Sequence, residues 1–114
     1  SDADNFEGDI SSIDWSEYID ETFAVRVKRF HAKIDTVATE RKAGSLILEN
    51  CDDIDRDILY CLTENLTYTE MAEKLKLTDR AIKYRVAKMI KTFGAKKRED
   101  LSDIMKSLLN SELK

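Results

Sequence analysis

The chain has 114 residues, no proline, three glycines and a formal net charge of −4. This length allows one domain with an extension, and apolar residues at helical spacing with so few helix breakers predict an all-α fold. No apolar run is long enough to span a membrane, and the first 23 residues are acidic where a signal peptide would be basic. We therefore expect a cytoplasmic protein. Because the chain begins with Ser-Asp rather than Met, we also expect either a fragment or a chain cleaved from a tag, which leaves open whether an upstream domain is missing.

Charge is distributed unevenly along the chain. Residues 1–23 contain eight acidic residues and no basic ones, a net −8, whereas residues 76–98 contain nine basic residues against Asp79 alone, a net +8. Salt screens charges separated by more than about 8–10 Å, so the local charge decides what a surface attracts. A chain with a negative total charge can therefore still bind phosphates through one concentrated basic segment.

Residues 1–13 are predicted to form a flexible acidic lead. The simpler interpretation is a solvated tail. The alternative is a segment that competes with phosphates for the basic residues further along the chain.

Residues 14–44 are predicted to form a long amphipathic helix, running from about Trp15 to Arg41, with Gly44 as its stop. Its apolar residues recur at spacings of four, three, four and three, which is a coiled-coil seam of about three heptads. We favour pairing of this seam with a second copy of the chain; the alternative is that it packs on the rest of its own chain. His31 is expected at the surface or at the edge of the dimer. The predicted dimerisation residues are Phe23, Val27, Phe30, Ile34 and Val37.

Residues 51–112 carry the signals of a domain of four helices. Asp52 can cap the first of these, with Asp55 at the third helical position to complete a capping box. Asn65 is expected in the left-handed conformation that ends a helix, since asparagine is the next best residue there after glycine. The buried face of the first helix should be formed by Ile58, Leu59 and Leu62.

Two short helices joined by a tight turn are predicted within residues 67–93. Thr67 and Glu70 form a capping box at the start of the first, and Thr78 can cap the second. The second helix, about residues 79–93, carries nearly all the local positive charge. A helix-turn-helix places such a basic helix in the major groove of DNA.

Residues 51–110 resemble the DNA-binding domain of the LuxR/FixJ family, the output domain of NarL-type response regulators. Asn65-Leu66-Thr67 corresponds to a Gly-Leu-Ser step of that family, and Glu70-Met71-Ala72 to its Glu-Ile-Ala. Phe93-Gly94-Ala95, followed by a basic turn, corresponds to its Leu-Gly-Val. The resemblance implies a four-helix helix-turn-helix domain preceded by a linker helix, with dimerisation through that helix, the last helix or both.

The basic helix divides into two faces. A buried stripe is predicted at Ile82, Val86, Met89, Ile90 and Phe93. By the resemblance, the base-contacting residues on the other face are Lys83, Tyr84 and Ala87. The residues expected to contact phosphates are Thr69, Arg80, Lys88 and Lys91. The alternative is that these charges only solvate a surface helix.

The sequence thus predicts a sequence-specific transcription regulator of bacterial type that binds double-stranded DNA as a homodimer at paired half-sites. RNA polymerase is a further candidate partner. Two alternatives stay open: a promoter-recognising module like that of a sigma factor, and a protein-interaction module in which the helix-turn-helix is only a scaffold.

Catalytic chemistry is not expected. His31 is the single histidine, and Cys51 and Cys61 do not have a metal or redox spacing. We expect both to be reduced thiols, with Cys61 in the core. No phosphate-binding glycine loop is present, so we predict neither an enzyme nor a cofactor nor a metal site.

Overall fold

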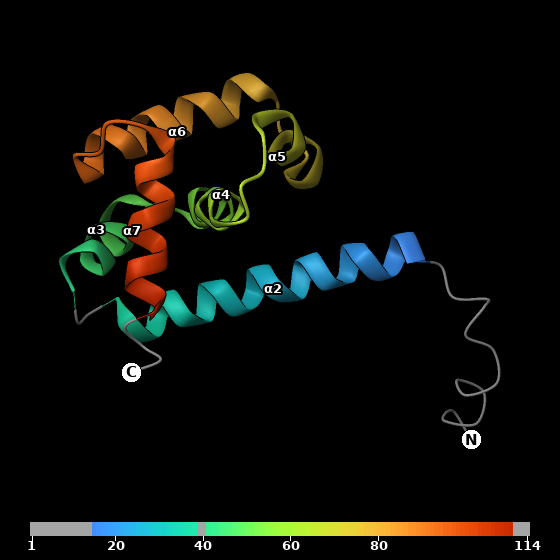
Figure 1. The fold of residues 1–114 in the computed structure, drawn as a ribbon, viewed down its shortest axis with the longest axis horizontal. Coiled ribbons are helices and arrows are strands. Elements are labelled where there is room, and N and C mark those ends of the chain that lie inside the picture. Colours follow the sequence, from blue (N-terminus) through green and yellow to red (C-terminus); the bar gives the residue numbers. More distant parts are fainter. Residues whose placement is uncertain (1–14, 39–40, 111–114) are drawn as a thin grey trace.

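The computed structural model describes residues 15–38 and 41–110, and of residues 15–21 it describes the backbone alone. These residues form six helices and no strand (Figure 1). The expected all-α fold is confirmed, whereas the predicted acidic lead of residues 1–13 lies outside the described residues. The helices are α2 (Trp15–Val37), α3 (Lys42–Asn50), α4 (Asp53–Thr63), α5 (Tyr68–Leu75), α6 (Asp79–Phe93) and α7 (Arg98–Asn110).

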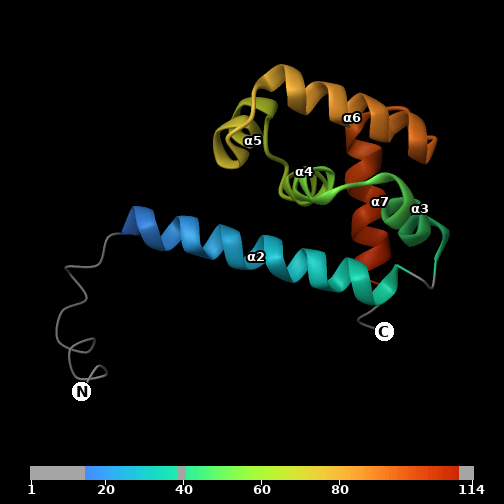
Figure 2. The same cartoon turned by 180° about the vertical axis from the view of Figure 1, so that it is seen from behind.

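Helix α4 occupies the centre of the fold and contacts α2, α5, α6 and α7. Figures 1 and 2 show α6 and α2 on opposite sides of it, with α7 running between them. One hydrophobic cluster joins all six helices. Its largest fully buried side chains include Ile34, Ile47, Ile58, Leu59, Leu62, Met71, Ile82, Leu101, Met105 and Leu108.

The predicted single helix over residues 14–44 is wrong after Val37. Helix α2 ends at Val37, and a separate helix, α3, begins at Lys42. Gly44 does not stop a helix but lies buried inside α3. A Cβ atom at this position would lie 2.4 Å from the Cα atom of Ala38, so the absent side chain is what allows α3 to approach the end of α2.

The predicted dimer seam also requires correction. Phe30, Ile34 and Val37 are only 3%, 0% and 2% exposed, because they pack into the core of their own chain. Phe23 and Val27 are partly buried against the same core. The part of the stripe from Phe30 to Val37 therefore follows the alternative that the sequence left open. Phe23 and Val27 also line an open pocket of about 730 Å³ between α2 and α5.

Polar contacts also join α2 to α4. Arg26 donates from Nε to the Tyr60 hydroxyl at 2.9 Å, and His31 Nε2 lies 2.6 Å from a carboxylate oxygen of Asp57. His31 is therefore part-buried between α2 and α4, with 22% of its side chain exposed. Of the helices that the structure describes, none is both long enough and apolar enough to cross a membrane.

Candidate nucleic-acid interface

The α5–α6 pair is built by the local signals that the sequence contains. Thr67 and Glu70 form the expected capping box, with the two hydrogen bonds at 3.1 and 2.8 Å. Thr78 accepts from the amide of Ala81 at 3.1 Å and so caps α6. Between the helices, Lys76 adopts a left-handed conformation with φ of 57°. These contacts fix the turn and hence the direction in which α6 leaves it.

Helix α6 has one buried and one exposed face, as its periodicity predicts. Ile82, Val86 and Met89 are buried in the core. Tyr84 is 70% exposed, which is unusual for a large aromatic side chain. All of the α6 residues predicted to contact DNA are exposed: Arg80, Lys83, Tyr84, Ala87, Lys88 and Lys91.

Two predicted contact residues have protein partners nearby. The Thr69 hydroxyl lies 3.4 Å from Asp79 Oδ2, a long hydrogen bond that joins the start of α5 to the start of α6. The Lys83 ammonium lies 5.8 Å from the centre of the Tyr68 ring, within the range of a cation–π contact. Lys83 therefore lies on the flank of α6 that faces α5, whereas Tyr84 points away from the body.

Arg85 has a role that the charge pattern did not indicate. Its guanidinium lies 2.9 Å from both Asp52 and Asp55, the two capping-box residues of α4. The pKa of Asp52 is held below its usual range, mainly by the hydrogen bond from the backbone amide of Asp55 and also by the hydrogen bond from the Arg85 guanidinium. Arg85 thus fastens the middle of α6 to the start of α4 and is not part of the exposed basic face.

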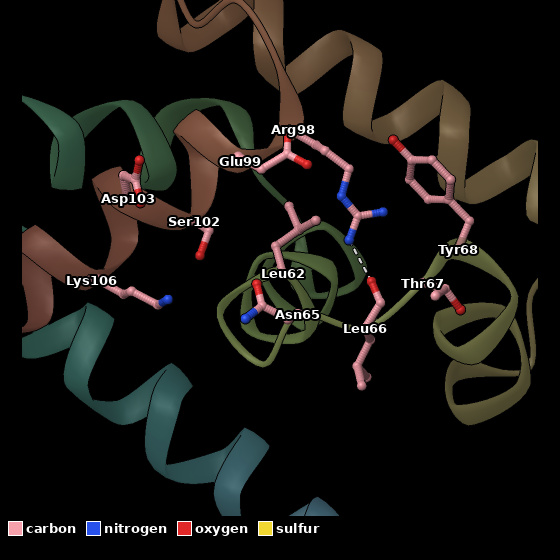
Figure 3. A pocket seen from close by; sticks show the side chains of 10 residues that line it. All are labelled: Leu62, Asn65, Leu66, Thr67, Tyr68, Arg98, Glu99, Ser102, Asp103 and Lys106. Atoms are coloured by element: carbon pink, nitrogen blue, oxygen red, sulfur yellow. Dashed lines mark hydrogen bonds between the residues drawn. The ribbon is translucent and has the colours of Figure 1, made fainter.

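Arg98 is also engaged within the fold. It donates to the carbonyl oxygen of Leu66 (Figure 3), and its guanidinium lies 4.6 Å from the centre of the Tyr68 ring. With Arg85 and Arg98 occupied, seven of the nine basic residues between positions 76 and 98 stay exposed. They are Lys76, Arg80, Lys83, Lys88, Lys91, Lys96 and Lys97.

Beside Arg98 lies an open pocket of about 400 Å³ between α7 and the segment that links α4 to α5 (Figure 3). Its charged lining is balanced, because Glu99 and Asp103 offset Arg98 and Lys106. Such a lining favours neither an anion nor a cation. The basic face of α6 is therefore the stronger candidate for a binding surface.

The two cysteines lie inside the domain. Burial raises the pKa of Cys51 to about 11 and that of Cys61 to about 12. Cys61 is 0% exposed, which confirms its expected place in the core. Within residues 15–38 and 41–110, no group of three or more His, Cys, Asp or Glu residues is placed to hold a metal ion.

Residues 52–90 match the AsnC-type helix-turn-helix domain. The matched segment begins at the cap of α4 and ends near the end of α6, so it contains the helix pair described above. This match supports the interpretation of the chain as a DNA-binding transcription regulator.

The match also shows that the resemblance to the LuxR/FixJ family, and with it the response-regulator interpretation, was wrong. The residues that carried this resemblance include the capping box of Thr67 and Glu70 and the left-handed residues Asn65 and Gly94. Such caps occur at the ends of many helices, so they indicate where helices begin and end without separating one helix-turn-helix family from another.

Over 48 residues, the chain is 38% identical to a tRNA (guanine(10)-N2)-dimethyltransferase of Methanothermobacter thermautotrophicus. The matched region covers 42% of this chain but only 14% of that protein. No solved structure is significantly similar to the chain.

Proposed function

We propose that the chain is a sequence-specific transcription regulator that binds double-stranded DNA with α6 in the major groove. The observation that carries this proposal is the exposed face of α6. It presents four cations and Tyr84, while the opposite face is held in the core. Asp79, at the first position, is the single acid in the helix. A rigid basic helix of this kind fits the dimensions of the major groove.

Base contacts and phosphate contacts are assigned to different residues of the exposed face. Lys83 and Tyr84 lie in the first half of α6 and Ala87 lies just past its middle. In a helix-turn-helix, the N-terminal part of the recognition helix contacts base edges. Lys83 can donate to guanine, and the ring of Tyr84 or the methyl group of Ala87 can pack against a thymine methyl. The phosphate contacts are assigned to Arg80, Lys88 and Lys91, with Thr69 as a weaker donor, because its hydroxyl already bonds Asp79.

Pairing of two copies on half-sites would need a surface other than Phe30, Ile34 and Val37 of α2, because these residues are buried in their own chain. Such half-sites would lie about one helical turn apart. Selection of bound sequences from a random duplex pool tests this point. A two-fold symmetric consensus would indicate two copies, and an asymmetric consensus would indicate one.

The same selection, followed by variants, tests the mode of binding. Lys88→Ala and Lys91→Ala should each weaken binding to all duplexes alike and reduce the salt slope by about one unit. Lys83→Ala should cost roughly 1–3 kcal/mol and relax the preference at one base position. If Lys83→Ala leaves the consensus unchanged, α6 does not lie in the groove as proposed. The proposal as a whole fails if wild-type binding shows no dependence on salt.

Structured RNA is a second candidate ligand, since the similar protein of Methanothermobacter thermautotrophicus is a tRNA (guanine(10)-N2)-dimethyltransferase. The major groove of A-form RNA is deep and narrow, so α6 should not enter it. Duplex DNA should therefore bind more tightly than tRNA at the same salt concentration. Tighter binding of tRNA would favour the RNA alternative. A promoter-recognising module of the sigma type would differ again, because tight binding would require core RNA polymerase.

A further inference from the structure

The turn between α6 and α7 is fixed from both sides. Gly94 ends α6 in a left-handed conformation with φ of 68°, and the amide of Ala95 donates to the carbonyl oxygen of Ile90 at 2.9 Å. Ala95 itself packs against the core. The chain therefore leaves α6 in one defined direction.

Asp100 fixes the next two residues. Its Oδ2 atom accepts from the backbone amides of Lys96 at 3.0 Å and Lys97 at 3.2 Å. These hydrogen bonds, of which the one from the Lys96 amide has the largest effect, hold the pKa of Asp100 below its usual range. The carboxylate is therefore charged at neutral pH. Both lysine side chains are exposed. Neither forms an ion pair within the part of the chain that the structure describes.

The position of the turn indicates which part of a bound duplex Lys96 and Lys97 would contact. They follow Gly94 and Ala95, the two residues after the end of α6, and Lys91 lies in the last turn of that helix. When the first half of a recognition helix enters the groove, its later basic residues meet phosphates. Lys91, Lys96 and Lys97 would then follow one backbone strand. Lysine suits this task, because its ammonium acts as a mobile point charge toward a phosphate.

We propose that the α6–α7 turn is a second phosphate-binding element, in which Lys96 and Lys97 contact the duplex backbone beside the end of α6. Asp100 is the positioning residue of this element. The inference rests on the proposed major-groove binding of α6 and adds the partner of the turn, which is the phosphodiester backbone of the same duplex.

The first test compares two double variants of the full chain on the selected duplex and on a scrambled one. Lys96→Ala with Lys97→Ala should lower the salt slope by about 1.8 units, because two phosphate contacts are lost. Affinity for both duplexes should fall by the same factor, and the consensus should not change. Folding should be retained, since both side chains are exposed, and thermal melting by circular dichroism checks this.

The matched control is Lys28→Ala with Lys33→Ala. These two exposed lysines lie on α2, which is on the other side of α4 from α6 (Figures 1 and 2). The change in net charge is the same, but the salt slope should stay at the wild-type value. Equal losses in the two double variants would mean that net charge alone acts, and would overturn the proposal.

The second test separates positioning from charge. Asp100→Ala and Asp100→Asn both remove one negative charge, which by electrostatics alone should strengthen DNA binding. Asparagine can still accept from the two amides, whereas alanine cannot. Asp100→Ala should therefore bind several-fold more weakly than Asp100→Asn, with a smaller salt slope. Equal affinities of these two variants would exclude a positioning role.

Failure of the inference about the α6–α7 turn can be distinguished from failure of the proposed function. If Lys88→Ala and Lys91→Ala lower the salt slope but the double variant of the turn does not, only the inference about the turn is wrong. If none of these variants changes the slope, the proposed binding by α6 is itself wrong.

Discussion

At the scale of single residues, the N-cap of α4, Asp52, gives the fold a defined dependence on pH. The pKa of Asp52 is lowered in the folded state by the amide of Asp55 and by Arg85. Such a carboxylate stabilises the fold above its unfolded-state pKa of about 3.9, and this contribution is lost as the pH falls through the lower folded-state value. We predict that Asp52→Asn shows a smaller loss of stability between pH 5 and pH 2 than the wild type. Urea unfolding at both pH values measures this, and identical losses would contradict it.

A second residue-scale prediction concerns Lys76, which has φ of 57° at the end of α5. A side chain in this conformation costs roughly 1–2 kcal/mol, and glycine avoids the cost at an entropic penalty of about 0.5–1 kcal/mol. Lys76→Gly should therefore raise the free energy of unfolding by up to about 1 kcal/mol. The control is Glu73→Gly, an exposed position inside the same helix, which should lower stability by about 1 kcal/mol. Destabilisation by both variants would show that Lys76 makes a contact worth more than its strain.

The exposed face of α6 and its caps could be predicted from the sequence, because both depend on residues that lie within one helix or one turn of each other. The same holds for Asn65, shortly after the end of α4, where the expected left-handed conformation is present with φ of 59°. Arg85 could not be assigned in this way. Its partners lie at positions 52 and 55, and only the packing of α6 on α4 brings them within 2.9 Å.

At the scale of elements, the contact between α2 and α3 depends on one missing side chain. A Cβ atom at Gly44 would lie 2.4 Å from Ala38 Cα and 2.6 Å from its carbonyl oxygen, and neither backbone atom can move independently. We predict that Gly44→Ala lowers the melting temperature. Overpacking typically costs roughly 1–3 kcal/mol, which should exceed the gain of about 1 kcal/mol in helix propensity. Ser45→Ala, one residue later in α3, should change the melting temperature little, whereas a stabilised Gly44→Ala would contradict the close approach.

The same comparison shows why this helix was mispredicted. A glycine after a periodic apolar segment is a local signal for a helix end, and here the requirement for close packing overrides it. The stripe of α2 is ambiguous for a related reason. A period of 3.5 residues indicates which face is buried but not whether the covering surface belongs to the same chain or to a second copy.

At the scale of the whole molecule, burial of this stripe changes what a charge in it should do. Ile34 is 0% exposed in the core of its own chain, and an unpaired buried charge is strongly destabilising. We predict that Ile34→Asp abolishes the folded state rather than converting a dimer into folded monomers. Circular dichroism measures the loss of helix, and Lys33→Asp, on the exposed side of α2, should remain folded. A folded, monomeric Ile34→Asp variant in sedimentation would restore the dimer interpretation.

The placement of the cysteines has a consequence for measuring motion in this domain. Cys61 lies on the central helix with no exposed surface, and its thiol, with a pKa of about 12, is almost fully protonated at neutral pH. An alkylating reagent needs both access and a thiolate, so it can react only while the core is open. The rate of alkylation therefore reports how often the native domain opens. Because a ligand that binds only the folded state reduces such openings, added DNA should slow the reaction even though it never contacts the sulfur atom.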